Sequence, residues 1–480
     1  MNNVLIEFFD QDYLENIIAS LDGSFNKVIF FYESQNKKFV EESSKYLKMF
    51  LYQKKKMSVE FRMIEPYDYT SVISSFDQLP MKNTNYVFDT TGGSNFFIAV
   101  AGYYAAHFPQ ENEIRIYDIN KGICYSSKEE QKSRKITLPK LKVEEIIKIH
   151  NASVIKEPGN LIRYTINNAD QKVLERLWKL ASEDTAQWNK FMNNPRIIYP
   201  HKTINGKNAI TRTDTVYNDD LACHNHVIKR LKEYGFVKFT KKTPCEEKKG
   251  AMEIKYDLFV PDSISSVFKQ AGNLLELYTY AAADRCGCFN DVVTGVNLDW
   301  DTKENKSSDE TSNEIDVIAT AGCIPIVISC KNTDIVKEHL YELETVANHY
   351  CGKYSRKVIA TSAKAPPVIR NRAKDMGIIV IDDLANTGFT KFQEKLKKNK
   401  PDTTISFLTP LYPGRHFLLI GAWQTMLIFI NLVKLCCKSR NQYHLPSCSP
   451  AHPLSYFGNS APCTRTGNPR RGQHRTQAHF

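Results

Sequence analysis

The sequence predicts an α/β protein in which two α/β domains are joined by a smaller connector. The chain has 480 residues, enough for about three domains of ~150 residues each. With 42% hydrophobic and 24% charged residues, its composition is that of a globular protein and excludes collagen-like and wholly disordered chains. Apolar runs of strand length alternate with helix-length segments in two separate regions, a pattern that is typical of parallel α/β sheets.

The first domain is expected to span residues 1–150. Its predicted strands are residues 4–9, 27–32, 59–64, 86–88 and 114–117, and its predicted helices are residues 37–52 and 95–107. Ligands of such sheets bind beyond the carboxyl ends of the strands. We therefore expect Asp10, Gln11, Ser34, Gln35 and residues 90–94 to lie along one edge of the sheet.

The connector is expected over residues 151–262 and the second α/β domain over residues 263–400. In the connector we predict a helix at 170–182, a polar loop at 207–220, and a helix at 225–234 followed by strands at 236–241 and 252–258. A helix followed by a hairpin is typical of a winged helix. In the second domain we predict helices at 263–283 and 334–347 and strands at 291–297, 314–320, 324–330, 357–360 and 377–381.

The cysteines and the start of the chain indicate a cytoplasmic protein. The twelve cysteines form no set of paired C-x-x-C motifs, so we expect reduced thiols and no structural zinc. No basic residue precedes the first apolar run, and Glu7 and Asp10 interrupt it, so the N-terminus does not resemble a signal peptide.

Residues 401–480 differ from the rest of the chain. They carry eight Lys or Arg and one acid, so most of the net charge of +11 lies there and bulk charge does not identify a partner. Residues 417–433 are uncharged, at the short limit for a membrane span. Three interpretations remain open: a membrane anchor, a buried or partner-binding helix, and an atypical, non-functional or disordered extension. We expect no mechanistic role for this tail and no membrane partner.

A glycine-rich turn follows the fourth predicted strand. Thr90, Thr91, Gly92, Gly93 and Ser94 lead into a helix that begins at Asn95. Backbone N–H groups and hydroxyls therefore gather at a helix N-terminus, where the helix dipole favours an anion. The segment is neither a Walker A loop nor a dinucleotide-binding glycine motif. A phosphate cradle and a tight turn with Ser94 as helix cap are both consistent with these residues.

Polar residues on two neighbouring strands suggest a second site. Asp316 enters an apolar strand, where an unpaired acid is costly. Ser329 and Lys331 share one face of the next strand, and a hairpin would bring Asp316 close to both. Such a set suits phosphodiester cleavage, in which Mg²⁺ or Mn²⁺ activates water and a lysine stabilises the phosphate charge. Surface residues at strand ends are the alternative interpretation.

Glu276 lies on the helix that precedes these strands. The apolar face of that helix, formed by Ala271, Leu275, Tyr278 and Ala282, is on the opposite side. From this pattern alone, Glu276 is a solvated surface residue.

Taken together, the two motifs resemble ancillary effectors of type III CRISPR systems, in which a CARF sensor domain is fused to a PD-(D/E)xK-type nuclease. The T-T-G-G-S turn is similar to the turn of CARF domains, which bind cyclic oligoadenylates across a dimer. A helical Glu followed by D-x(12)-S-x-K is similar to the nuclease core.

The resemblance implies the role of each residue. The ring phosphates would be lined by residues 90–94, with Asp10 and Gln11 nearby, and Asn95 stands where many relatives have a lysine. In the nuclease, Glu276 and Asp316 would bind the metal and Lys331 would be the catalytic lysine. Ser329 occupies the position of a Glu or Asp, and a neutral hydroxyl is a poorer ligand for a hard cation.

The implied fold is a Rossmann-like sensor domain, a winged-helix-like connector and a restriction-endonuclease-like domain. The implied function is that of a homodimeric nuclease that is activated by a cyclic oligoadenylate, such as cyclic tetra-adenylate, and cleaves DNA or RNA with Mg²⁺ or Mn²⁺. Two alternatives are a ligand-sensing transcriptional regulator with an inactive nuclease core and a stand-alone nucleotide-binding enzyme. The absence of both phosphate-loop motifs counts against the second alternative.

Overall fold

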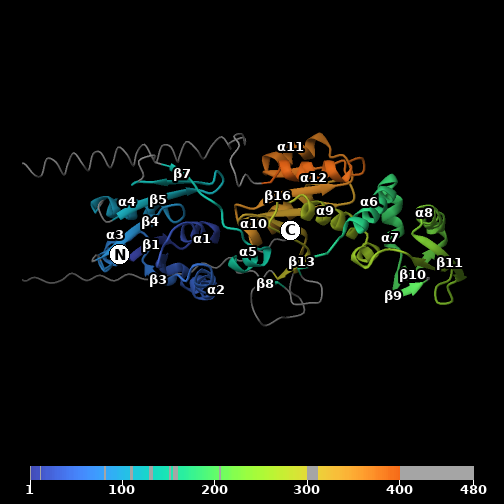
Figure 1. Cartoon of the computed structure of the whole chain (residues 1–480), viewed down its shortest axis with the longest axis horizontal. Coiled ribbons are helices and arrows are strands. Elements are labelled where there is room, and N and C mark those ends of the chain that lie inside the picture. Colours follow the sequence, from blue (N-terminus) through green and yellow to red (C-terminus); the bar gives the residue numbers. More distant parts are fainter. Residues whose placement is uncertain are drawn as a thin grey trace, which may run out of the picture. The chain divides into compact units, whose positions relative to one another are not determined.

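We analysed a computed structural model of the chain (Figure 1). It describes residues 2–10, 12–80, 83–108, 112–128, 133–150, 153–154, 161–204, 207–299 and 312–400. Gln11 and the tail at residues 401–480 lie outside the described residues.

The first domain is built on one mixed sheet. Its strands are β1 (Asn2–Phe8), β2 (Lys27–Glu33), β3 (Ser58–Ile64), β4 (Thr84–Asp89), β5 (Asn112–Asp118), β6 (Ile123–Ser126) and β7 (Ser133–Lys135). They lie in the order β3-β2-β1-β4-β5-β6-β7. The first five are parallel and the last two are antiparallel. This arrangement confirms the predicted parallel α/β core.

Helices cover both faces of this sheet (Figure 1). On one face, α1 (Tyr13–Asp22), α2 (Lys37–Lys55) and α5 (Val143–Ile149) share a hydrophobic cluster with Leu5 and Phe30. On the other, α3 (Tyr69–Asp77) and α4 (Asn95–His107) pack against Ile6 and Phe31. Neighbouring strand residues thus face opposite clusters, which explains the continuous apolar runs. A 3-10 turn at Ser34–Asn36 leads from β2 into α2.

The connector is a four-stranded antiparallel sheet with helices against it. Its helices are α6 (Asn168–Glu183), α7 (Thr185–Asn193) and α8 (Leu221–Glu233). Its strands, in the order β11-β12-β10-β9, are β11 (Val237–Pro244), β12 (Ala251–Leu258), β10 (Lys207–Tyr217) and β9 (Arg196–Ile204). The predicted helix and hairpin are present as α8, β11 and β12. The polar loop predicted at 207–220 is wrong, because β10 occupies most of it.

Charged residues hide the strand pattern of β10. Arg212 and Asp214 point inward and are fully buried. Asp214 Oδ1 lies 2.6 Å from Arg212 Nε, and its Oδ2 lies 2.8 Å from His224 Nε2 and accepts the Tyr256 hydroxyl at 2.7 Å. Arg212 also donates to the carbonyls of Phe191 and Phe268 at 3.3 Å. Burial acts to raise the pKa of Asp214, but these donors hold it below its usual value.

The second α/β domain has a sheet in the order β17-β16-β15-β14-β13-β8. Its strands are β8 (Ser153–Val154), β13 (Asp291–Asp299), β14 (Ser312–Ala321), β15 (Ile324–Lys331), β16 (Arg356–Thr361) and β17 (Ile378–Ile381). Strands β13, β14 and β15 are antiparallel, and β15, β16 and β17 are parallel. Strand β8 pairs with β13. Residues 153–154, which were predicted to belong to the connector, are therefore part of the sheet of the second α/β domain.

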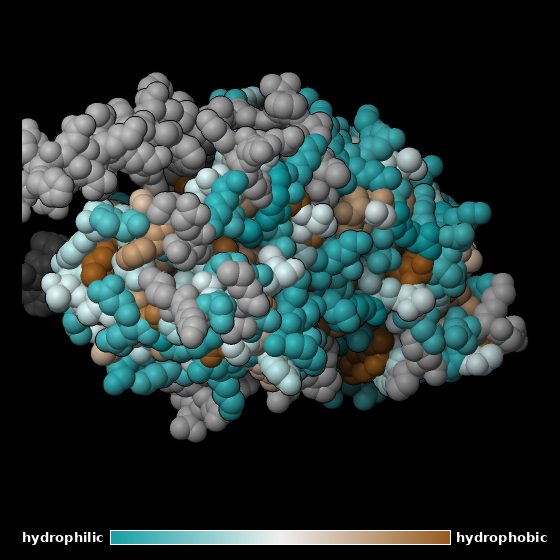
Figure 2. Space-filling view, turned by 60° about the vertical axis from the view of Figure 1, so that its left-hand side comes forward, coloured by the Kyte–Doolittle hydropathy of each residue, from teal (hydrophilic) through white to brown (hydrophobic). Residues whose placement is uncertain are grey.

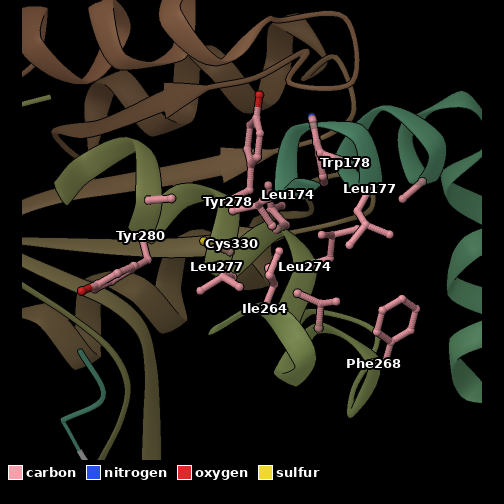
Figure 3. Packing of buried hydrophobic residues seen from close by; sticks show 14 of the residues in the cluster. Leu174, Leu177, Trp178, Ile264, Phe268, Leu274, Leu277, Tyr278, Tyr280 and Cys330 are labelled. Carbon is pink, nitrogen blue, oxygen red and sulfur yellow. The ribbon is translucent and has the colours of Figure 1, made fainter. Parts of the chain in front are cut away.

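Helices α9 (Asn273–Arg285) and α12 (Phe389–Lys398) cover one face of this sheet, and α10 (Lys337–Cys351) and α11 (Pro367–Asp375) cover the other. The single helix predicted at 263–283 is divided into a 3-10 segment, η3 (Asp262–Phe268), and α9. Figure 3 shows Cys330 of β15 close to the helix that carries Leu274, Leu277 and Tyr278. The rings of Trp178 and Tyr278 stack with centroids 5.0 Å apart, so α6 of the connector packs directly against α9.

Figure 2 shows one face of the molecule, on which hydrophilic residues predominate and hydrophobic residues appear in separate small patches. Within the described ranges, no helix is both long enough and apolar enough to cross a membrane.

The buried network of the connector gives a first prediction. Replacing Asp214 by Asn leaves the Arg212 guanidinium buried without its counter-charge, so we expect a loss of about 3–5 kcal/mol in the free energy of unfolding. Asp219→Asn, which changes an exposed acid in the same domain, is the control and should be neutral. Urea unfolding followed by circular dichroism measures both. Equal midpoints for the two variants would contradict the role given to the network.

Candidate functional site

The β14–β15 hairpin brings together three of the predicted catalytic residues. In its register Val317 lies opposite Ile328, so Asp316 and Ser329 are adjacent across the pair. Asp316 Oδ2 accepts the backbone N–H of Cys330 at 2.6 Å and the Ser329 hydroxyl at 3.4 Å. Lys331 ends the same strand two residues later. The juxtaposition that the sequence predicted for Asp316, Ser329 and Lys331 is therefore present.

Glu276 faces this group from α9. Glu276 is half-buried rather than fully solvated, because α9, with nine buried residues, is covered on several sides. The Oε1 atom of Glu276 lies 2.8 Å from the position that a Cβ on Gly272 would occupy. The carboxyl folds back over the start of its own helix, and a larger residue at 272 would displace it. We call Glu276, Asp316, Ser329 and Lys331 the nuclease centre.

The acids of the nuclease centre are held in surroundings that oppose their ionisation. Burial raises the pKa of Glu276 to about 8, with further contributions from Asp316 and Glu314, while Lys331 acts in the other direction. Burial raises the pKa of Asp316 to about 6, against the hydrogen bond from Cys330 and the charge of Lys331. Asp316 and Glu314 thus raise the pKa of Glu276, and Glu314 raises that of Asp316, so Lys331 only partly offsets a cluster of acids.

A divalent cation would balance the negative charge of this cluster of acids. Oxygen ligands and uncompensated negative charge are what Mg²⁺ and Mn²⁺ prefer. Among the described residues, however, no group of three or more His, Cys, Asp or Glu side chains is placed to hold a metal. Glu276 and Asp316 would therefore bind it together with water, backbone carbonyls or the substrate.

Sequence reasoning did not single out Glu314. This residue precedes Asp316 by two positions on β14 and is exposed, whereas Asp316 is half-buried. Its charge contributes to the raised pKa values of Glu276 and Asp316. The E-x-D spacing of Glu314 and Asp316 was the available sequence signal. Glu314 adds a third acid to a site in which Ser329 stands at the position of an acid.

Two glutamates of α10 have different partners. Lys331 Nζ lies 3.7 Å from Glu342 Oε2, and Lys357 Nζ lies 3.3 Å from Glu344 Oε1. Glu342 is therefore the glutamate of α10 that faces Lys331. Because the Glu342 side chain is 63% exposed, Lys331 is free to exchange it for a phosphate at little cost.

In the first domain, residues 90–94 form the predicted turn between β4 and α4, here called the glycine turn. The hydroxyls of its threonines are used within the protein. Thr91 Oγ1 donates to Asp89 at 2.5 Å and accepts the backbone N–H of Tyr117 at 2.8 Å. Thr90 Oγ1 donates to the carbonyl of Arg115 at 3.2 Å. Ser94 caps α4 by accepting the N–H of Phe97. The N–H groups of both threonines are also bonded within the protein, so a ligand would meet the backbone at the glycine end of the turn.

The glycines of this turn have steric reasons to be there. Gly93 has φ of +115°, and a Cβ on it would lie 2.7 Å from Phe8. A Cβ on Gly92 would lie 2.6 Å from Glu15 Oε2. The N–H of Gly93 donates to Asp10 Oδ2 at 3.3 Å, which confirms that the ends of β1 and β4 meet at one edge. Asn95 begins α4 and is exposed.

The two described cavities lie away from both sites. One, of about 640 Å³, lies between the start of α7 and the loops after β16 and β17, and includes Ser362 and Asp383. The other, of about 470 Å³, lies at the opposite edge of the first sheet, beside Arg115 and Arg134. Arg115 pairs with Glu113 and Arg134 with Asp22, so these cations are already compensated. Catalysis is better assigned from the chemistry of the nuclease centre than from cavity size.

Residues 266–399 match the family of Card1-like endonuclease domains, and they include the whole nuclease centre. This match supports the endonuclease that the sequence predicted for the second α/β domain. No curated protein matches the chain in sequence.

Two solved structures share the fold over most of the chain. The protein VC1899 from Vibrio cholerae has a TM-score of 0.58 at 14% identity, covering 82% of this chain and 97% of that one. Can2 from Sulfobacillus thermosulfidooxidans, solved in complex with cyclic tetra-adenylate, has a TM-score of 0.56 at 17% identity, covering 83% and 99%. These likenesses confirm the fold that the sequence predicted for the described domains.

The raised pKa values give a prediction about metal binding. Protonation of Glu276 and Asp316 favours the folded state, so their contribution to stability falls as the pH rises from about 4 to about 8. A cation that binds the ionised carboxyls reverses this loss. We therefore expect about 5 mM Mn²⁺ to raise the melting temperature more at about pH 8 than at about pH 5.5.

The control separates this site from others. Asp316→Asn should remove most of the Mn²⁺-dependent gain at about pH 8, whereas Asp334→Asn, an exposed acid just after β15, should keep it. A thermal shift series across pH measures this. A gain that is independent of pH, or that survives in Asp316→Asn, would rule out metal binding at these two carboxyls.

Proposed function

We propose that this protein is a metal-dependent nuclease that is activated by a cyclic oligoadenylate and acts in type III CRISPR defence in the cytoplasm. The observation that carries this proposal is the convergence of Glu276, Asp316, Ser329 and Lys331 within the residues that match a Card1-like endonuclease domain. The fold shared with Can2, which was solved with cyclic tetra-adenylate, supports a ligand of that class for the first domain.

The residues of the nuclease centre have complementary tasks. A bound Mg²⁺ or Mn²⁺ supplies an activated water and neutralises phosphate charge. Glu276 and Asp316 would hold the cation, and the Cys330 N–H fixes the orientation of Asp316. Lys331, released from Glu342, would stabilise the negative charge that develops on the phosphate. Ser329 keeps Asp316 in place by its hydroxyl, and Glu314 would compensate for the acid that position 329 lacks.

The ligand site is proposed at the glycine turn. The backbone N–H groups of residues 92–95 lie at the N-terminus of α4, where they would meet ring phosphates. Asp10 accepts the N–H of Gly93 and would give it up to a phosphate oxygen. A ring with twofold symmetry suits a homodimer in which each chain offers the same turn.

A second candidate function has one observation in its favour. Ser329 replaces an acid of the nuclease pattern, and the described residues contain no three-ligand metal group. A ligand-sensing regulator with an inactive nuclease core would show these features. In that case the connector, with α8, β11 and β12, would bind DNA while the protein cleaves none.

Variants of the nuclease centre test the proposal. Asp316→Asn and Lys331→Met should each lower the cleavage rate at least about 100-fold, because they remove a metal ligand or a charge that stabilises the transition state. Affinity for cyclic tetra-adenylate, measured by calorimetry, should not change. Asp334→Asn and Lys337→Ala, which alter exposed residues of the same domain, serve as matched controls and should keep full activity.

The same experiment separates the two functions. Cleavage of single-stranded DNA or RNA by the unmodified chain, lost in Asp316→Asn, supports the nuclease. If no cleavage occurs with Mg²⁺ or Mn²⁺ while duplex DNA is bound, the regulator is the better account.

A further inference from the structure

Residues of the endonuclease domain lie against the ligand edge of the first domain. The loop between α10 and β16 contains Gly352, Lys353 and Tyr354. Lys353 Nζ lies 2.8 Å from Glu15 Oε1, and the Tyr354 hydroxyl donates to the same oxygen at 2.5 Å. The backbone N–H of Lys353 donates to Asp12 Oδ2 at 3.0 Å. Asp12 immediately precedes α1 and Glu15 lies in its first turn, so one loop of the endonuclease contacts both.

Glu15 links this loop to the glycine turn. Its Oε2 atom is the atom that a Cβ on Gly92 would meet at 2.6 Å. The turn is tied to the same region by Asp10, whose Oδ2 accepts the N–H of Gly93 and whose Oδ1 accepts the N–H of Asp12. Lys353, Glu15 and Gly92 are therefore consecutive neighbours that connect two domains.

The charge at this edge is unfavourable for a polyanion unless a cation takes part. Asp10, Asp12 and Glu15 are all acids, and buried oxygens of Asp12 and Glu15 have no hydrogen-bond partner. Burial raises the pKa of Glu15, against the hydrogen bonds from Lys353 and Tyr354. Lys353 is the cation that faces these acids, and its side chain is 54% exposed. Because it is already partly exposed, the Lys353 side chain can move into the solvent beside the glycine turn without having to leave a buried position.

We propose that Lys353 of the endonuclease domain is a phosphate-binding residue of the ligand site at the glycine turn, and that it exchanges Glu15 for a ring phosphate when the ligand binds. This inference rests on the proposed function. It supplies the positive charge that Asn95 does not offer at the start of α4. Because the cation comes from the other domain, ligand binding acts directly on the endonuclease.

The exchange has a path to the nuclease centre. Lys353 and Tyr354 lie in the short loop before β16, which is parallel to β15 and pairs with it along its length. In that register Ile359 lies opposite Ser329 and Thr361 lies opposite Lys331. A shift of the loop at the start of β16 is therefore transmitted along one strand to the residues beside the catalytic lysine. A ligand can bias the nuclease in this way by as much as its contacts differ between the two arrangements.

Calorimetry with the full chain and cyclic tetra-adenylate tests this assignment. Lys353→Ala should weaken binding about tenfold, the usual effect of losing one charge-assisted contact. Lys353→Arg keeps the charge and should bind within about threefold of the unmodified chain. Lys337→Ala removes an exposed lysine from the same domain and should not change affinity. Glu15→Gln removes the competing carboxylate and should tighten binding.

Each contrary result has a distinct meaning. Unchanged affinity in Lys353→Ala would overturn the inference while leaving the proposed function intact. An equal loss in Lys353→Ala and Lys353→Arg would attribute the effect to packing and also overturn it. If the unmodified chain binds neither cyclic tetra-adenylate nor cyclic hexa-adenylate, the proposed ligand fails and the inference falls with it.

Discussion

The register between β14 and β15 is the constraint on which the chemistry of this protein depends. Because side chains alternate along a strand, a slip of one residue would turn Asp316 or Lys331 to the opposite face. The register is fixed by burial on both sides, with Val317 and Ile328 packed against α9 and Ile318 and Val327 packed against α10. The apolar residues of the hairpin thus hold an acid, a hydroxyl and a lysine in one place.

Burial that fixes the register also tunes the acids. The pKa values of Glu276 and Asp316 are raised because both residues lie beside the hydrophobic core that α9 helps to form. At an exposed site the same acids would be ionised and hydrated. A cation bound there would relieve less of the cost of burying negative charge. The connector contributes to this arrangement, since Trp178 of α6 stacks on Tyr278 of α9 and Arg212 bonds the carbonyl of Phe268 just before it. The position of Glu276 is therefore set partly from outside the endonuclease domain.

Much of the architecture could be predicted from the sequence, and the exceptions have physical causes. Strands with two buried faces give continuous apolar runs, so β1, β2, β13, β14 and β15 were all predicted. Helix α1 was not, because nine of its ten residues are buried and they include Glu15, Asn16 and Ser20, which obscures any helical periodicity. Strand β10 has the sequence pattern of a polar loop because Arg212 and Asp214 fill its inward positions. In the site, D-x(12)-S-x-K predicted the hairpin contacts and E-x-D was the signal for Glu314, whereas the partial burial of Glu276 and the approach of Lys353 depend on long-range packing.

The central claim is that a cyclic oligoadenylate bound at the glycine turn controls cleavage at the nuclease centre. The most direct measurement is the initial rate of single-stranded DNA cleavage by the full chain with Mn²⁺, with and without saturating cyclic tetra-adenylate. The account predicts a low rate without the ligand and an increase of at least about tenfold with it, equivalent to about 1.4 kcal/mol of coupling. Equal rates in the two conditions, in protein shown by calorimetry to have bound the ligand, would contradict it.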